Sequence, residues 1–397
     1  MNNQKKDILF ILNNLHCGGA EKALISLLHT IDYTHYSVDL LLFKQEGLFL
    51  NQLPKQVNLL PEPNNYKYFD MSIKTAILDN LKKGNFNVIY HRILAGFLFK
   101  TEKNKALAEQ KLWKYLSKTL SPLPKKYDAA IGYLEKTPNY FCVDKVNAKT
   151  KIGFIHNDYD MLKMDVTFDY EYIEKFDQVF TVSDTCKHIL VKNFPEFAAK
   201  FNVMYNIVSA KTIEALANDK ISLDNQHKTI ITVGRLNKQK GYELAIEACS
   251  LLKKARVSVK WYVLGEGEER EPLEKLIKDY DLEDTFFLKG IIENPYPYIK
   301  AADVYVQTSR FEGKSIAIDE AKILNKPIVV TSFDTVYDQI THLQNGFIVP
   351  LEPTAIAQGI ITVFQDYQLR KTIIANLENE QKGNEDEINK ILEVIER

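Results

Sequence analysis

The chain has 397 residues, which is too long for one compact core and predicts two domains of ordinary size. Its apolar content of 45% and charged content of 26% are typical of a soluble globular protein, and a net charge of −1 provides no general attraction to nucleic acid. Four scattered cysteines without metal-ligand spacing predict reduced thiols in a cytoplasmic protein. The short apolar run at 8–12 indicates a first strand rather than a signal peptide, and no uninterrupted apolar segment approaches the roughly 20 residues of a membrane span.

Short apolar runs alternate with amphipathic stretches along the whole chain. Strands are expected at 8–12, 37–43, 88–90, 129–133, 151–155, 178–182 and 202–205, and then at 229–233, 260–264, 285–288, 304–307 and 327–331. This alternation predicts an α/β fold with two parallel sheets, each covered by helices on both faces. We expect the first domain at 1–206 and the second at 207–380, with a linker at about 207–228. A helical pattern at 381–397 ends the chain.

The first strand–helix junction contains paired glycines, in the sequence Gly18-Gly19-Ala20-Glu21-Lys22. Glycines at such a junction allow a ligand or another backbone to come close. The spacing is not that of a dinucleotide-binding fingerprint. A tight turn that serves only helix packing is the alternative.

The stretch 99–126 is strongly basic in a nearly neutral chain. Eight lysines face only Glu102 and Glu109, a local charge of +6, and Leu107, Trp113 and Leu116 are among the apolar residues interleaved with them. A basic amphipathic helix of this kind can lie on an anionic membrane surface. A domain helix with a solvated lysine face explains the same pattern, and the sequence leaves both interpretations open.

Two strand ends in the first half carry polar side chains. Glu135 follows one predicted strand, and His156, Asn157 and Asp158 follow the next. Ligands bind at the carboxyl ends of strands in open α/β sheets, so these side chains are candidates to line a cleft. Residues 158–160 also form an Asp-x-Asp motif, but its place in a loop after a histidine disfavours a metal-binding role, and we expect no metal site.

The second half opens with a strand that ends in Gly234, followed by Arg235 and, five residues later, Lys240. A guanidinium and an ammonium group at the entrance to a helix can hold a diphosphate. A solvated basic loop is the alternative. Gly265, Glu266 and Lys289 come at the next strand ends and are expected to line the same pocket.

The stretch 309–324 combines a strand end, a polar loop and a helix. Gly313, Lys314, Ser315 and Ile316 fall at the expected start of the helix, where free N–H groups and the helix dipole favour an anion. Glu312 and Glu320 bracket this start with seven residues between them. An ordinary strand–loop–helix unit with two solvated glutamates is the alternative.

Together these motifs resemble the retaining glycosyltransferases of family four, also called glycosyltransferase group 1, which have the GT-B fold of two Rossmann-like domains. The R-x4-K-G, E-x7-E, Gly-Gly and Ile-His patterns occur in family order. The resemblance implies that Glu312 touches the donor sugar and Glu320 the nucleotide ribose, while Arg235 and Lys240 neutralise the leaving diphosphate. It also implies catalytic roles for Glu312, His156, Arg235 and Lys240, and a C-terminal helix at 381–397 that crosses back to the N-terminal domain. It assigns donor contacts to Gly18, Gly19, Gly265, Glu266, Lys289 and 313–316, and acceptor contacts to Glu135, Asn157 and Asp158.

The activity implied by this resemblance is metal-independent, retaining transfer from a nucleotide-diphosphate sugar, with uridine favoured as the base and no cofactor. The acceptor would be a glycan or a lipid-linked molecule in bacterial polysaccharide synthesis, in the cytoplasm or at the inner face of the membrane, with contact through 99–126. Two alternatives remain: a nucleotide-sugar 2-epimerase, and a catalytically silent partner subunit.

Overall fold

The computed structural model describes residues 5–16, 18–221, 223 and 226–397. They form two compact units. Unit 1 comprises Ala20–Tyr205, the described part of Met1–His16, and Asp386–Arg397. Unit 2 comprises Asn206–Glu385 and also includes Gly18 and Gly19. The chain therefore leaves unit 1 after Tyr205 and returns to it at Asp386. The boundaries expected from the sequence are 206 and 381.

Unit 1 is built on a seven-stranded parallel sheet with the order β3-β2-β1-β4-β5-β6-β7. Its strands are β1 (Lys6–Leu12), β2 (Tyr36–Leu42), β3 (Asn58–Leu59), β4 (Lys126–Gly132), β5 (Asn147–Ile155), β6 (Gln178–Thr181) and β7 (Phe201–Val203). The central strands are buried along most of their length, as expected for strands covered on both faces.

The helices of unit 1 follow its strands. They are α1 (Gly19–Thr30), α2 (Lys67–Asp70), α3 (Ile73–Lys82), α4 (Phe86–Thr101), α5 (Lys105–Leu116), α6 (Thr137–Lys145), α7 (Tyr159–Leu162), α8 (Val166–Lys175), α9 (Asp184–Asn193) and α17 (Ile388–Glu396). In its core, the hydroxyls of Tyr140 and Tyr159 both donate to the Asp169 carboxylate. Burial raises the pKa of Asp169, while these two hydrogen bonds oppose the shift.

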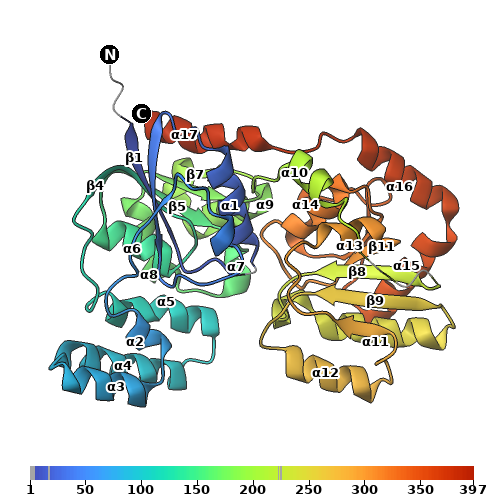
Figure 1. Ribbon diagram of the computed structural model, residues 1–397, viewed down its shortest axis with the longest axis horizontal. Coiled ribbons are helices and arrows are strands. Elements are labelled where there is room, and N and C mark those ends of the chain that lie inside the picture. The colour runs from blue at the N-terminus through green and yellow to red at the C-terminus, as the bar shows by residue number, and fades with distance from the viewer. Residues whose placement is uncertain (1–4, 17, 222, 224–225) are drawn as a thin grey trace. The chain divides into compact units, whose positions relative to one another are not determined.

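Between β3 and β4 the chain forms a group of helices, α2 to α5, at one end of unit 1 (Figure 1). The strand predicted at 88–90 is wrong, because these residues lie inside α4, with Val88 buried and Tyr90 exposed. Three apolar residues cannot distinguish a strand from a helix. Gly84 at φ 67° ends α3, and α4 starts two residues later.

The single helix expected over 99–126 is also wrong. The stretch spans the end of α4, the whole of α5 and a coil that runs into β4. Asn104 caps α5 by accepting from the N–H groups of Ala106 and Leu107. Trp113 and Leu116 belong to the hydrophobic core of unit 1, so the apolar face of α5 is turned inward.

Unit 2 contains a six-stranded parallel sheet with the order β10-β9-β8-β11-β12-β13. Its strands are β8 (Lys228–Val233), β9 (Val259–Leu264), β10 (Phe286–Leu288), β11 (Val304–Gln307), β12 (Ile328–Thr331) and β13 (Phe347–Val349), the last of which was not predicted. Its helices are α10 (Ala210–Leu216), α11 (Tyr242–Lys254), α12 (Arg270–Asp279), α13 (Tyr296–Ala301), α14 (Ile316–Ile323), α15 (Pro353–Gln365) and α16 (Tyr367–Asn379).

The two sheets confirm the predicted α/β class with parallel strands. The stretch expected as a linker contains α10, whose Ile213 is buried within unit 2. Among the described residues, no helix has the length and apolarity needed to cross a membrane.

Candidate active site

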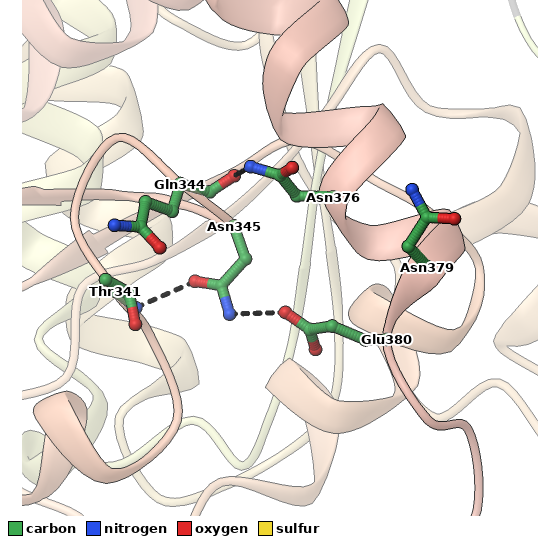
Figure 2. A pocket seen from close by; sticks show the side chains of 6 residues that line it. All are labelled: Thr341, Gln344, Asn345, Asn376, Asn379 and Glu380. Atoms are coloured by element: carbon green, nitrogen blue, oxygen red, sulfur yellow. Dashed lines mark hydrogen bonds between the residues drawn. The ribbon is translucent and has the colours of Figure 1, made fainter.

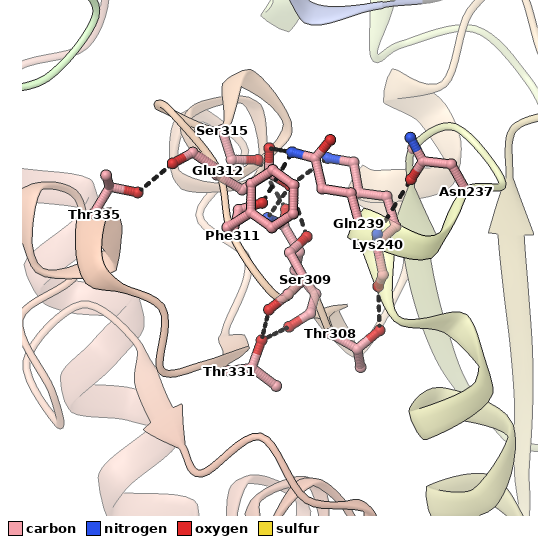
Figure 3. Close-up of polar contacts among 12 residues, drawn as sticks. Asn237, Gln239, Lys240, Thr308, Ser309, Phe311, Glu312, Ser315, Thr331 and Thr335 are labelled. Carbon is pink, nitrogen blue, oxygen red and sulfur yellow. Dashed lines mark hydrogen bonds and ion pairs between the residues drawn. The ribbon is translucent and has the colours of Figure 1, made fainter. Parts of the chain in front are cut away.

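Two neighbouring strand ends in unit 2 carry the most closely connected candidate residues (Figure 3). β8 and β11 are adjacent and parallel, so the loops that follow them leave the same edge of the sheet. Three hydrogen bonds join these loops: Thr308 Oγ1 to the Lys240 carbonyl at 2.9 Å, the Arg310 N–H to the Gln239 carbonyl at 2.8 Å, and Gln239 Nε2 to the Phe311 carbonyl at 2.9 Å.

Gly241 permits this close approach. Its φ of 61° lies in the left-handed region, and an added Cβ would lie 2.4 Å from the Thr308 carbonyl oxygen. Lys240 ends a short 3-10 helix (Lys238–Lys240), and the Asn237 side chain accepts from its N–H. The loop is therefore held from both sides, and the Lys240 side chain extends from a fixed backbone.

The two loops bring together two residues that the sequence placed 72 positions apart. Lys240 Nζ lies 2.6 Å from Glu312 Oε1, and the side chains are only 17% and 9% exposed. The same oxygen accepts from Ser309 Oγ at 2.7 Å, and Gln307 and Gln239 approach the carboxylate at 3.4 Å. Glu312 is thus an ordered, partly buried carboxylate rather than a solvated surface group.

The start of α14 is already partly occupied. The Ser315 N–H, one of the amides expected to be free for an anion, donates to Gln339 Oε1 at 2.8 Å, and Gln339 Nε2 donates to the Ser315 carbonyl and to Asp319. Gln339 therefore caps this helix in the structure. An anion at this position would have to share or displace that cap.

The other donor-side candidates lie along the same sheet. Glu320 is buried on α14, where Tyr296 donates to it at 3.2 Å. Gly265 follows β9 at a point where a Cβ would lie 1.9 Å from the Gly234 carbonyl. Glu266 accepts from Arg270 at 2.7 Å, which lowers its pKa.

The remaining donor-side candidates differ in burial. Gly313 and Ile316 are buried, and Lys314 is half-buried beside Asp319, with its Nζ 3.7 Å from Oδ2. Arg235 and Lys289 are exposed in the loops after β8 and β10. Gly18 is half-buried, and Gly19, the first residue of α1, is exposed.

The acceptor-side candidates meet in unit 1. Glu135, after β4, is buried and accepts from the His156 N–H at 2.9 Å and from Asn157 Nδ2 at 2.6 Å. β4 and β5 are adjacent and parallel, which explains why residues 21 positions apart come together at one edge. The structure therefore assembles Glu135, His156 and Asn157 as one cluster.

His156 is a buried imidazole among aromatic rings. Its ring centroid lies 5.5 Å from that of Phe154 and 5.0 Å from that of Tyr133. Burial lowers the pKa of His156 to about 4, against the opposing effects of the Glu135 carboxylate and the Tyr133 carbonyl. Neither ring nitrogen makes a well-aligned hydrogen bond with a described residue. A neutral ring with unused donor and acceptor capacity is suited to binding a hydroxyl.

The Asp-x-Asp residues each have a structural role. Asp158 caps α7 by accepting from the Met161 N–H, the Tyr159 hydroxyl donates to Asp169, and Asp160 pairs with Lys192. Among residues 5–16, 18–221, 223 and 226–397, no group of three or more His, Cys, Asp or Glu side chains could hold a metal ion. The expected absence of a metal site stays a prediction.

A polar pocket of about 270 Å³ in unit 2 is separate from these clusters (Figure 2). Its central side chain, Asn345, accepts from the Thr341 N–H and donates to Glu380, while Asn376 donates to the Gln344 carbonyl. These hydrogen bonds tie the loop before β13 to the end of α16, which indicates a structural role for the pocket.

Sequence reasoning missed the residues that support Glu312. Ser309, Gln307 and Gln239 all contact its carboxylate. It also missed Gln339, which directly follows a separate 3-10 helix (Asp334–Asp338) and contacts Ser315. Ser309 and Gln307 lie at a recognisable strand end, so their position was a usable signal. Nothing local marks Gln239 or Gln339, because their contacts depend on how the loops fold.

Part of this sequence is similar to known glycosyltransferases. Residues 215–380, less than half of the chain, match the sequence model of the family described as glycosyl transferases group 1. A Campylobacter jejuni N-acetylgalactosamine-N,N'-diacetylbacillosaminyl-diphospho-undecaprenol 4-alpha-N-acetylgalactosaminyltransferase is 32% identical over 46% of this chain and 49% of its own length. A Staphylococcus aureus poly(ribitol-phosphate) alpha-N-acetylglucosaminyltransferase is 26% identical over 53% of this chain and 43% of its own. The alignments thus span about half the length of these curated relatives.

Solved structures match over nearly the whole chain. S. aureus TarM, in a complex containing UDP, superposes with a TM-score of 0.69 at 15% identity, covering 99% of this chain and 100% of that one. Anabaena HepE with UDP superposes with a TM-score of 0.64 at 17% identity, covering 98% of both chains. The fold is therefore GT-B, as predicted, and the sequence matches support a glycosyltransferase of group 1.

Proposed function

We propose that this protein is a retaining, metal-independent glycosyltransferase that moves a sugar from a nucleotide-diphosphate sugar, a UDP-sugar, to a glycan or lipid-linked acceptor in bacterial surface polysaccharide or glycoconjugate synthesis. The observation that carries the proposal is the Lys240–Glu312 pair at the carboxyl ends of β8 and β11, held by hydrogen bonds from both loops. The names of the sequence relatives and the UDP in the TarM and HepE complexes support the substrate class.

In this proposal the Lys240 ammonium group lies between the Glu312 carboxylate and the diphosphate of the donor. An ammonium group has three N–H donors, and the contact with Glu312 uses one of them. The others are available to a diphosphate oxygen, so Lys240 can lie between two anionic partners and reduce their repulsion. Arg235, in the same loop, would supply the second positive charge. Together they would stabilise the charge that develops on the leaving diphosphate.

Glu312 would then bind hydroxyls of the donor sugar, since a carboxylate fixed by Lys240 and Ser309 still has lone pairs to accept with. Glu320 would bind the ribose, exchanging its hydrogen bond from Tyr296 for a ribose hydroxyl. Occupation of the α14 amides by a phosphate would require Gln339 to release the Ser315 N–H.

For the acceptor we propose the cluster in unit 1. His156, neutral at pH 7, would bind an acceptor or sugar hydroxyl, and Glu135, which accepts from the His156 N–H and from Asn157 Nδ2, would hold the loop in place. The transfer step is a front-face displacement. The bond from the anomeric carbon to the phosphate oxygen breaks, the bond to the acceptor oxygen forms on the same face, and the acceptor's proton passes to that phosphate oxygen.

The experiment is thermal melting of the full chain with UDP, GDP and ADP, each with and without EDTA. A ligand that binds only the folded state raises the melting temperature. UDP is expected to stabilise the wild type regardless of EDTA, and Arg235→Ala and Lys240→Ala are expected to abolish the shift. Lys254→Ala is the matched control, because Lys254 is an exposed lysine at the far end of α11, the helix that follows Lys240.

Product analysis separates the alternatives. Incubation with a panel of UDP-sugars and a glycan acceptor should release UDP and form a product that keeps the anomeric configuration, and Glu312→Gln should reduce the rate. An epimerised nucleotide sugar without an acceptor would identify an epimerase instead. If no nucleotide shifts the wild type, the proposed diphosphate site is wrong and a catalytically silent subunit is favoured.

A further inference from the structure

The α3–α4 helix pair of unit 1 presents an apolar surface to solvent. Among the described residues, half of the large hydrophobic side chains that are exposed fall between residues 78 and 99. They are Leu78, Leu81, Phe86, Tyr90, Ile93, Phe97 and Phe99, and we call this set the α3–α4 patch. Single exposed hydrophobic residues are ordinary, but such a concentration usually marks an interaction site.

The patch follows the geometry of the helix. Phe86, Tyr90, Ile93 and Phe97 recur at intervals of four, three and four residues, so they line one face of α4. Phe86 and Phe97 are each 68% exposed. Val88 and Ala95, on the opposite face, are part of the hydrophobic core of unit 1. α4 is therefore a surface helix that is apolar on both sides, and only one side is covered by the fold.

The helix pair is held firmly in place. The side chain of Ile73, the first residue of α3, lies against Gly96 of α4, where even a Cβ would lie 2.3 Å from Ile73 Cδ1. The buried guanidinium of Arg92 donates to the Tyr68 carbonyl at 2.6 Å and to the Met71 carbonyl at 2.7 Å. The exposed aromatic side chains thus stand on a rigid support and are not the edge of a loose segment.

Positive charge surrounds the patch. Residues 73–103 contain six lysines or arginines and only Asp79 and Glu102 as acids, a net charge of +4 in a chain of −1. Both acids are paired, Asp79 with Lys83 at 2.8 Å and Glu102 with Lys111 at 3.3 Å. Lys74 and Lys82 on α3 and Lys100 on α4 are exposed. Lys74 lies at the start of α3, Lys82 at its end and Lys100 at the end of α4, so ammonium groups lie around the apolar surface.

From this combination we propose that the α3–α4 patch docks the protein on an anionic lipid bilayer, with α4 lying in the plane of the interface. Phenylalanine and tyrosine side chains insert at the boundary between headgroups and acyl chains, while lysines at the margin attract acidic headgroups. A second copy of the chain fits less well, because it would bring two surfaces of charge +4 together. The proposal does not depend on the transfer reaction, since it rests on this surface alone.

The test is flotation of the full chain with vesicles. One set contains phosphatidylcholine alone, and the other contains equal parts of phosphatidylcholine and phosphatidylglycerol. The wild type is expected to float with the anionic vesicles and to be released by high salt. Phe86→Ser/Phe97→Ser is expected to weaken binding by at least about tenfold, because each loses an inserted aromatic ring. Lys74→Gln/Lys82→Gln/Lys100→Gln is expected to weaken binding to the anionic vesicles by on the order of a hundredfold at low salt.

Tyr337→Ser/Tyr367→Ser is the matched control. These tyrosines are 65% and 66% exposed in unit 2, so the variant removes equally exposed aromatic rings outside the patch and should bind as the wild type does. Melting curves of all variants verify that they fold. The proposal is overturned if the wild type does not float with anionic vesicles, or if the Phe86→Ser/Phe97→Ser variant floats equally well. Light scattering adds a third result against it: a wild-type dimer that this variant splits, without vesicle binding, would assign the patch to a second copy.

Discussion

Replacing His156 with phenylalanine tests the assignment of a neutral, buried imidazole in unit 1. Burial lowers the pKa of His156 from 6.5 to about 4, so the unfolded chain takes up a proton on this residue at a higher pH than the folded chain does. The neutral ring therefore contributes its full stability above about pH 6.5, and this contribution is lost as the pH falls toward 4. The shift of about 2.5 units corresponds to roughly 3 kcal/mol in total, of which about 2 kcal/mol is lost by pH 5.

Phenylalanine keeps the ring beside Phe154 and Tyr133 and removes the titration. Unit 1 can be followed alone in a Trp261→Phe background, in which Trp113, buried in the unit 1 core, is the remaining tryptophan. Urea unfolding at pH 7.5 and pH 5 should show that the parent loses about 2 kcal/mol more than His156→Phe does between these pH values. If both lose the same amount, His156 is not held neutral by burial, and its proposed role as a hydroxyl-binding group is wrong.

Three further predictions concern the packing of the two units. Asp169→Ala should destabilise unit 1 by roughly 3 kcal/mol, because two buried tyrosine hydroxyls lose their acceptor, and urea unfolding measures the change. Gly241→Ala should lower the free energy of unfolding of unit 2 by at least about 2 kcal/mol, because the new Cβ meets the Thr308 carbonyl and also strains φ; urea unfolding measures the change. Gly84→Ala separates these causes, since Gly84 has a φ of 67° with open space around it, and an equal loss there would contradict the steric argument. Deleting 386–397 should expose the core beneath α17 and reduce the unfolding midpoint of unit 1, whereas unit 2 should keep its own.

The sequence predicts the sheets well because their strands are buried on both faces. The runs at 8–12 and 304–307 are almost purely apolar, and this composition has few other solutions in a folded protein. The same reasoning fails at 88–90, where a β-prone triplet is one turn of α4. The useful signal there was the spacing of Phe86, Tyr90, Ile93 and Phe97, which indicates a helix but says nothing of which face is covered.

The candidate site divides in the same way. The positions of Lys240 and Glu312 at two strand ends follow from the pattern, because carboxyl ends of neighbouring parallel strands share one edge. Their direct contact does not, since it depends on Gly241 and on the hydrogen bonds between the two loops. The contact of Gln339 is even less predictable, because Gln339 accepts from the Ser315 N–H although it lies 24 residues further along the chain. The roles of all these residues in transfer remain predictions.

The path of the chain through unit 1 has a consequence for protein engineering and for synthesis on the ribosome. Residues 206–385 are one continuous insertion, whereas unit 1 is completed only by its last segment, in which the Ile395 carbonyl accepts from Lys6 Nζ at 3.0 Å and Glu396 binds Tyr36. A nascent chain can thus finish unit 2 while unit 1 still lacks a helix. A circular permutant that joins residue 397 to residue 5 through a short linker and opens between Tyr205 and Asn206 would place 206–385 first and 386–397 directly before 5–205, so that unit 2 is completed before the synthesis of unit 1 begins.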